Sequence, residues 1–83
     1  MIQDIKERIA KNTVTIGTDS TLKGLRQGKL DTVVITQNCP EDIITLIETL
    51  HAETKIVKID QKNDELGIIC KKPFSISVLG FLK

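Results

Sequence analysis

The stretch TVVIT at residues 32–36 is an unbroken run of β-branched side chains. A strand with one face in water alternates apolar and polar residues, whereas this run is apolar at three consecutive positions and predicts a strand covered on both faces. Sheets covered on both faces are typical of the α/β class, in which helices pack above and below the strands. The segments on either side of this strand must then supply the covering helices.

Amphipathic helical patterns alternate with short strand patterns along the rest of the chain. The periodicity predicts helices over residues 2–11, 20–27, 41–52 and from Asn63 or Asp64 to about Lys71, and further strands over 14–16, 55–59 and 74–82. The strand at 55–59 is expected to be buried like the one at 32–36. The order α-β-α-β-α-β-α-β predicts a three-layer α/β/α sandwich that forms one domain over residues 1–83.

Composition limits the ways in which this chain can bind nucleic acid. Twelve Lys and Arg residues against eleven Asp and Glu leave a formal charge of +1, so no uniform field attracts nucleic acid or a membrane surface. The only aromatic residues are two Phe, which argues against an aromatic platform for single-stranded nucleic acid. Any nucleic-acid binding must therefore come from a local patch of basic side chains.

The chemistry-bearing residues do not form a catalytic or metal-binding set. Cys39 and Cys70 make neither a Cys-x-x-Cys pair nor a disulfide framework, which indicates a reduced, cytoplasmic chain. Together with the single histidine, His51, they do not complete a zinc site, so no metal or other cofactor is expected. No serine or cysteine has an evident base beside it, so the protein is not expected to be an enzyme. Neither a signal peptide nor a membrane span is recognisable.

The turn GTDSTLK at residues 17–23 is the first candidate binding site. It leads from a strand into the predicted helix, where free backbone N–H groups, the hydroxyls at 18, 20 and 21 and the Lys23 ammonium can together attract an anion. The alternative interpretation is that Thr18 or Ser20 only caps the helix and that Lys23 is solvated. The spacing matches neither a P-loop nor the Gly-x-Gly-x-x-Gly fingerprint.

Basic residues gather in two stretches of the chain. Residues 17–29 hold Lys23, Arg26 and Lys29 with Asp19 as the only acid, and residues 70–83 hold three lysines and no acid. In an α/β/α sandwich, the start of the second helix, the Asn38 turn and the turn into the last strand can meet at one end of the sheet, where such folds bind ligands. That arrangement predicts a patch able to neutralise a few phosphates. A solvated surface of mixed charge is the alternative.

The segment KKPF at residues 71–74 is the second candidate site. Pro73 stiffens the chain ahead of Phe74, and two cations precede it, so the ring can contact an extruded base. As the first residue of the predicted last strand, Phe74 can equally belong to the core. The residues alone leave both possibilities open.

Four motifs carry a resemblance to a known family. They are STLK-x-LRQGK at 20–29, VI-x-x-NCP at 34–40, ELG at 65–67 and C-x-KPF at 70–74, and they fall in order along residues 12–83. On these motifs the chain resembles the kink-turn-binding ribosomal proteins of archaea and eukaryotes, the superfamily of the large-subunit proteins L-thirty-e and L-seven-Ae. The likeness to L-thirty-e is the closer one.

The resemblance implies a four-stranded mixed sheet inside the α/β/α sandwich and a non-enzymatic protein of the ribosome that binds an RNA kink-turn. It also implies that the strand-to-helix turn meets the G·A pairs and that the loop before the last strand meets a flipped-out base. The implied RNA-binding residues, including the lysines that add charge, are Gly17, Thr18, Asp19, Ser20, Thr21, Lys23, Lys29, Asn38, Lys71, Lys72, Pro73 and Phe74. The alternatives are a small-anion or nucleotide-binding domain that uses the same helix start, and an interaction module without nucleic acid.

Overall fold

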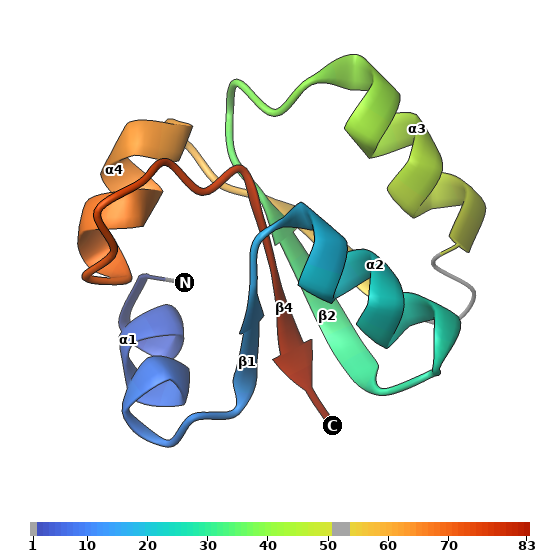
Figure 1. Cartoon of the computed structure of the whole chain (residues 1–83), viewed down its shortest axis with the longest axis horizontal. Coiled ribbons are helices and arrows are strands. Elements are labelled where there is room, and N and C mark those ends of the chain that lie inside the picture. Colours follow the sequence, from blue (N-terminus) through green and yellow to red (C-terminus); the bar gives the residue numbers. More distant parts are fainter. Residues whose placement is uncertain (1, 51–53) are drawn as a thin grey trace.

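Helices and strands alternate along the chain in the computed structural model, which describes residues 2–50 and 54–83 (Figure 1). The helices are α1 (Ile2–Ala10), α2 (Thr18–Arg26), α3 (Glu41–Leu50) and α4 (Asn63–Ile69). The strands are β1 (Val14–Ile16), β2 (Leu30–Ile35), β3 (Lys55–Lys58) and β4 (Val78–Leu82). This arrangement confirms the predicted order of elements. The predicted end of the third helix at residue 52 and His51 lie outside the described residues.

The sheet is four-stranded, with the order β1-β4-β2-β3. β2 pairs in parallel with β3, whereas β4 pairs antiparallel with both β1 and β2, so the sheet is mixed as predicted. Because β4 runs against the other strands, the carboxyl ends of β1, β2 and β3 lie at the same end of the sheet as the amino end of β4. This end is at the top of Figure 1 and is called the upper end below.

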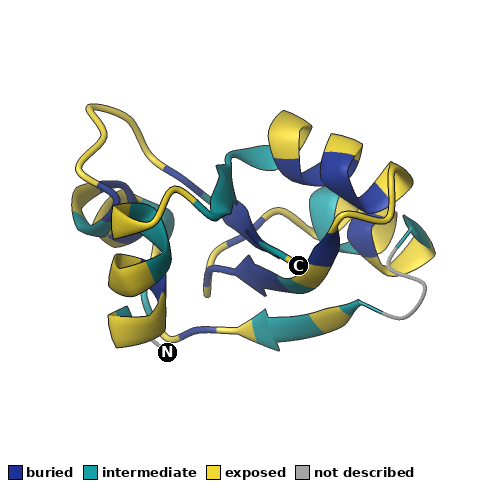
Figure 2. Ribbon diagram, turned by 90° about the horizontal axis from the view of Figure 1, so that it is seen from below, coloured by how far each residue is buried: buried dark blue, intermediate teal, exposed yellow. Residues whose placement is uncertain are grey.

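Two helices cover each face of the sheet, with α1 and α4 on one side and α2 and α3 on the other (Figure 1). Ile5 and Leu66 belong to the first core, and Leu22 belongs to the second. Val33 and Val34, neighbours on β2, are both fully buried but pack into opposite cores. β2, which contains most of the β-branched run at 32–36, is therefore covered on both faces, as predicted. Figure 2 shows the buried residues gathered along the sheet and on the inner sides of the helices.

Two strand predictions are wrong in detail. The last strand was expected over 74–82, but it begins at Val78. Residues 74–77 instead follow α4, where the Ile76 N–H donates to the Asn63 carbonyl at 3.0 Å. The strand at 55–59 was expected to be buried, yet β3 lies at the edge of the sheet and is only half-buried. An edge strand has a neighbour on one side alone, and periodicity does not reveal the position of a strand in the sheet.

The Thr18 or Ser20 cap considered for the second helix does not form, and the fourth helix also has no side-chain bond from its N-cap residue. α2 begins at Thr18, and its N-cap is Gly17, with no side chain bonded to the cap. α4 begins at Asn63 with Lys62 as its N-cap, again without a hydrogen bond from the cap side chain. The helix starts are set by contacts with other parts of the chain, which the local pattern of Ser, Thr, Asp and Asn does not contain.

Candidate nucleic-acid interface

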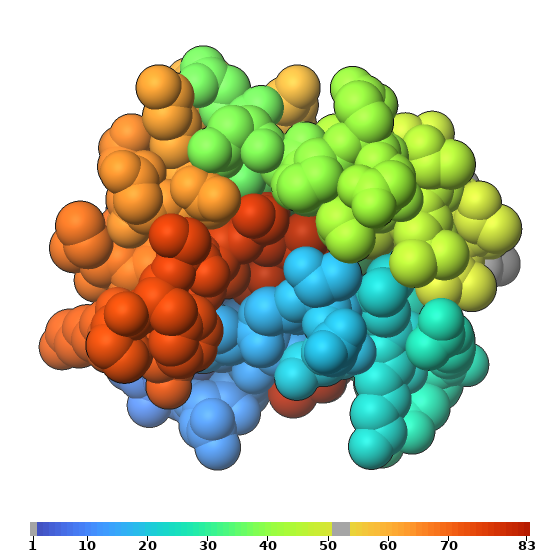
Figure 3. All heavy atoms as spheres, turned by 45° about the horizontal axis from the view of Figure 1, so that its top comes forward, coloured from blue at the N-terminus to red at the C-terminus, as the bar shows by residue number. Residues whose placement is uncertain are grey.

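The start of α2 and the loop into β4 meet at the upper end of the sheet. The Gly17 N–H donates to the Val78 carbonyl at 3.0 Å, and the Thr36 N–H donates to the Ser77 carbonyl at 3.0 Å. These bonds hold the start of α2 and the end of β2 on either side of the first residues of β4. Figure 3 brings this end forward and shows the start of α2, the turn after β2 and the loop before β4 on one face. The predicted convergence of these segments is confirmed.

The backbone at Gly17 turns the chain directly from β1 into α2. Its φ of 96° and ψ of 163° lie in a region that is essentially restricted to glycine. The first bond within the helix runs from the Thr21 N–H to the Gly17 carbonyl at 3.1 Å. The N–H groups of Thr18, Asp19 and Ser20 therefore have no acceptor within the helix and lie at its positive pole. This helix start can donate hydrogen bonds to phosphate oxygens or base edges.

Thr21 is a packing residue and not a surface residue. Its side chain is fully buried, and its Oγ1 lies 3.1 Å from Oγ1 of Thr15 on β1. The hydroxyl pair fastens the first turn of α2 to the sheet, because a buried hydroxyl requires a partner. The prediction that Thr21 touches RNA is therefore wrong: the helical repeat turns this position inward, toward β1.

Lys23 and Lys29 lie at opposite ends of α2. Lys23 is exposed one turn after the helix start, on the same outward side as Asp19 and Ser20. Lys29 follows the last turn, and its carbonyl accepts the Lys83 N–H at 3.0 Å. A helix of nine residues is about 13 Å long, so Lys29 belongs to the lower end of the sheet. The grouping of Lys29 with the other site residues is corrected accordingly.

Asn38 links the turn after β2 to the start of α4. Its Oδ1 accepts the Asn63 N–H at 2.9 Å and the Thr36 Oγ1 hydroxyl at 3.2 Å, and its Nδ2 donates to Asn63 Oδ1 at 3.1 Å. Asn63 in turn donates from Nδ2 to Ser77 Oγ at 3.5 Å. Because its amide is engaged in this network, Asn38 positions the surrounding segments. Sequence reasoning missed this role, since the partner of Asn38 is 25 residues away and no local signal marks it.

Replacing Asn38 with alanine should lower the free energy of unfolding by about 1–2 kcal/mol, because α4 loses its capping acceptor. Chemical denaturation followed by circular dichroism measures the change. Gln37→Ala is the matched control: Gln37 is exposed, its backbone N–H donates to the Gln61 carbonyl at 2.9 Å, and its side chain has no hydrogen bond within residues 2–50 and 54–83. Equal stability of the two variants would show that the Asn38 contacts do not hold α4 in place.

The loop at residues 72–77 presents its first residues to solvent. Lys72, Pro73 and Phe74 are all exposed, and 55% of the Phe74 surface is accessible, so Phe74 is not a core residue. The loop is held by Gly67 of α4, where a Cβ would overlap the Phe74 carbonyl oxygen. Gly67 permits this close approach because it carries no side chain. Phe74 is thus an exposed ring on a loop that is tightly packed through its backbone.

Lys71 does not share this loop surface. It lines a groove between α1 and α4 together with Lys6 and Ile9. The predicted last helix ran to Lys71, but α4 ends at Ile69, and the chain reverses at Lys71, whose φ is 58°. After this reversal the loop at 72–77 runs back along α4 toward the upper end, whereas Lys71 stays beside α1 (Figure 1). The prediction that the two lysines act together is corrected.

A sequence model of the Ribosomal protein L7Ae/L30e/S12e/Gadd45 family matches residues 2–83. The chain belongs to this family. The large ribosomal subunit protein eL30 of Archaeoglobus fulgidus is 36% identical over 75 residues, which are 90% of this chain and 85% of the relative. The eL30 protein of Sulfolobus acidocaldarius is 32% identical over 81 residues, which are 95% of this chain and 78% of the relative. The resemblance drawn from the four motifs is confirmed.

Solved structures of low sequence identity share the fold of this L7Ae/L30e family member. The Giardia lamblia 15.5kD RNA binding protein superposes with a TM-score of 0.85 at 20% identity, over 99% of this chain and 70% of that chain. A Bacillus halodurans protein of unknown function superposes with a TM-score of 0.82 at 12% identity, over 99% of this chain and 83% of that chain. The three-layer arrangement is therefore retained with few identical residues.

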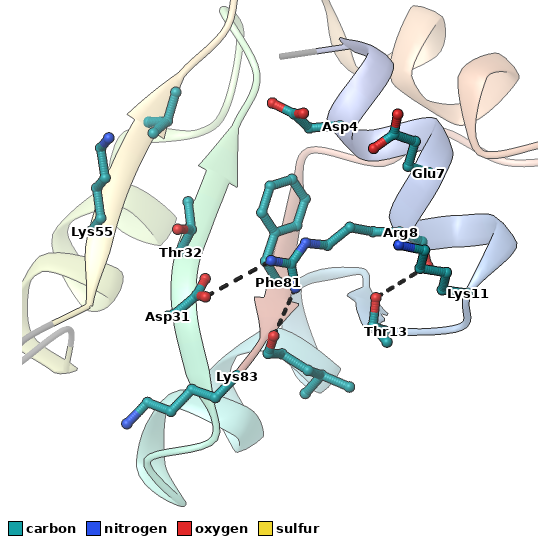
Figure 4. Close-up of a pocket in the computed structure, with 12 residues that line it drawn as sticks. Asp4, Glu7, Arg8, Lys11, Thr13, Asp31, Thr32, Lys55, Phe81 and Lys83 are labelled. Carbon is teal, nitrogen blue, oxygen red and sulfur yellow. Dashed lines mark hydrogen bonds and ion pairs between the residues drawn. The ribbon is translucent and has the colours of Figure 1, made fainter.

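A cavity of about 620 Å³ lies at the lower end, between α1 and the strands (Figure 4). Arg8 enters it, stacks 4.7 Å above the Phe81 ring centroid, donates to the Leu82 carbonyl at 2.7 Å and pairs with Asp31 at 3.8 Å. These contacts fasten α1 to β2 and β4. The rest of the lining mixes the Asp4 and Glu7 carboxylates with three lysines, Lys11, Lys55 and Lys83. The cavity is separate from the α2 start, where the anion of the alternative function would bind.

Both cysteines of this family member are free and buried. Burial raises the pKa of the Cys39 thiol, with a further rise from Asp42, and burial likewise raises the pKa of Cys70. A raised pKa reduces the thiolate population, so neither sulfur is activated as a nucleophile. Within residues 2–50 and 54–83, no group of three or more His, Cys, Asp and Glu side chains is placed to hold a metal ion. The same residues contain no helix long and apolar enough to span a membrane.

Proposed function

We propose that this L7Ae/L30e family member is a cytoplasmic ribosomal protein that binds a kink-turn in RNA through the upper end of its sheet. The observation that supports this most directly is the meeting of two different binding elements on one face. Unpaired backbone donors stand at the start of α2, and the exposed Phe74 ring stands on the loop before β4. The names of the eL30 relatives and of the Giardia RNA binding protein agree with this function.

The two elements suit different parts of a bent RNA. The N–H groups of Thr18, Asp19 and Ser20 can donate to phosphates and to purine edges at sheared G·A pairs, with Lys23 adding a positive charge one turn later. Phe74 can stack on an unpaired base, because RNA recognition depends on bases that have left the helical stack. Lys72 precedes the ring and can neutralise a nearby phosphate. Gly17 lets the RNA approach the backbone closely, since it carries no side chain.

A gel-shift comparison tests the function directly. The probes are a generic kink-turn RNA and a copy in which the two G·A pairs are changed to Watson–Crick pairs. The kink-turn should bind at least about tenfold more tightly, because the mutated copy is straight and offers only phosphate attraction. Equal affinity for the two RNAs would reject kink-turn recognition. Thermal stabilisation by a free nucleotide and not by the kink-turn would instead support the small-anion function.

Replacing Lys23 with alanine should weaken kink-turn binding and reduce the salt dependence of the binding constant by about one unit of log–log slope, because one phosphate contact is lost. Binding is measured by fluorescence anisotropy at several salt concentrations. Lys29→Ala is the matched control, since Lys29 is also an exposed lysine but lies at the far end of α2. An unchanged salt slope for Lys23→Ala, or equal losses of affinity in both variants, would show that the RNA does not bind at the start of α2.

A further inference from the structure

A second surface lies between α1 and α4, away from the α2 start. Its groove has a volume of about 340 Å³ and is lined by Lys6, Ile9 and Ala10 from α1 and by Ile69 and Lys71 from the end of α4. The lining therefore combines an apolar floor with two lysines and contains no carboxylate. At the lower limit of the usual size of ligand pockets, such a groove accepts one or two side chains and not a whole cofactor.

Ile68, the residue before Ile69 in α4, is an exposed apolar side chain close in the chain to this groove. Its side chain is 76% exposed, compared with 55% for Phe74 and 37% for Leu46, the other large apolar residues that are exposed in the described part of the chain. Ile68 precedes Ile69 in α4, and its carbonyl accepts the Lys71 N–H at 3.0 Å. Single exposed apolar residues are common, but one that stands next in the chain to a groove-lining isoleucine supports an interaction site at the end of α4.

The backbone at Lys71 is an independent sign of function. Three helices end in the same left-handed reversal, in which the residue with positive φ is Asn12 after α1, Gly28 after α2 and Lys71 after α4. Glycine and asparagine suit this conformation, whereas lysine is strained there by about 1 kcal/mol. A lysine in a backbone conformation that glycine would adopt without strain points to a use for its side chain.

We propose that the surface formed by Lys6, Ile9, Ile68, Ile69 and Lys71 docks an acidic segment of a protein partner that carries exposed apolar side chains. The apolar floor accepts the partner's aliphatic anchors, and the two lysines pair with its flanking carboxylates. An RNA strand fits less well, because its sugar and phosphate groups would lie on isoleucine. A second copy of this chain also fits less well, since a two-fold contact would bring the lysine-rimmed grooves of both copies together.

This surface adjoins the proposed RNA face without overlapping it. Lys71 lies at the end of the groove, and Lys72 begins the exposed loop that carries Phe74. The docking surface and the proposed RNA face are therefore separated by the backbone reversal at Lys71. A protein partner bound here would therefore stand next to a bound RNA. The docking surface nevertheless depends only on the contacts between α1 and α4 and remains testable if the RNA proposal fails.

The test is a titration of the ¹⁵N-labelled full chain, followed by amide chemical shifts. The probe is a synthetic 14-residue helical peptide with leucines at helical i, i+3 and i+7 spacing and glutamates between them, the pattern of groove-binding helices. The control peptide carries lysines in place of the glutamates. The acidic peptide should shift the amides of Lys6, Ile9, Ile69 and Lys71 and should bind at least about fivefold more tightly than the basic one.

Two variants make the result decisive. Ile68→Ser should weaken peptide binding at least about fivefold through the lost apolar contact, with little change in thermal stability, because the side chain is exposed. Lys71→Gly should weaken binding similarly while it raises the melting temperature. Equal binding of the acidic and basic peptides, shifts confined to residues 72–77, or full binding by Lys71→Gly would overturn the proposal. Stronger shifts at the groove with oligouridine, or concentration-dependent dimerisation through Ile68, would also overturn it.

Discussion

Replacing Gly67 with alanine is expected to lower the free energy of unfolding by about 3 kcal/mol, a large fraction of the total stability of a domain of this size. An added Cβ would overlap the Phe74 carbonyl oxygen and lie 3.2 Å from its carbonyl carbon and 3.4 Å from Ser75 Cα. These are backbone atoms, so they cannot rotate away as the end of a side chain can. Either the loop at 72–77 leaves α4, or α4 moves away from the sheet.

Thermal unfolding followed by circular dichroism measures this effect, which should appear as a fall in melting temperature of at least about 12 °C. Gly24→Ala is the matched control, because Gly24 also lies inside a helix and gains the same helix propensity. A Cβ there would lie 3.0 Å from Leu30 Cγ, in a buried side chain that can shift by a few tenths of an ångström, so Gly24→Ala should cost clearly less than Gly67→Ala, at most about 1–2 kcal/mol. A Gly67→Ala variant as stable as the control would mean that the loop does not rest on α4.

Replacing Phe74 with alanine is expected to reduce kink-turn affinity by about 10- to 100-fold, because stacking on a base contributes about 1–3 kcal/mol. More than half of the Phe74 side chain is exposed, so its removal should change the free energy of unfolding by less than about 0.5 kcal/mol. The variant thus separates RNA binding from stability, which Gly67→Ala does not. Anisotropy with labelled kink-turn RNA and denaturation of the same samples provide the two measurements.

Ile68→Ala is the matched control for Phe74→Ala. Ile68 is 76% exposed, more than Phe74, and it lies in α4, the helix on which the loop rests. Its side chain is not part of the proposed RNA face. RNA affinity should be unchanged in Ile68→Ala and retained in Phe74→Tyr, which keeps the ring. Loss of affinity in Ile68→Ala, or full affinity in Phe74→Ala, would contradict the proposed role of the ring. Comparison with the peptide titration then tests whether RNA and protein use separate surfaces.

Much of the candidate site was predictable because its parts are local. Gly17 ends a β-branched strand and precedes a helical pattern, and Gly67 interrupts an apolar stripe, so each position is marked by its neighbours in the chain. The position of Phe74 was not predictable in the same way. Its exposure depends on whether residues 74–77 pair with a strand or follow α4, and both states suit an apolar residue after a proline.

The errors among the site residues have one physical cause. Thr21 was assigned to the binding face as one of three hydroxyls that can attract an anion at the helix start, but β1 lies beneath that position. Lys29 and Lys71 were assigned by their charge, although a nine-residue helix and a backbone reversal place them elsewhere. Charge and hydroxyl content describe what a residue can do and do not say which direction it faces.

The sequence alone determined the α/β/α class, the order of the elements and the family, because β-branched runs, helical periodicity and glycine breaks act over a few residues of chain. Only the tertiary structure decided the strand order, the bond between Asn38 and Asn63, the burial of Thr21 and the groove beside Lys71. Such contacts join residues far apart in the chain, and their formation depends on the packing of the whole core, which no single segment encodes.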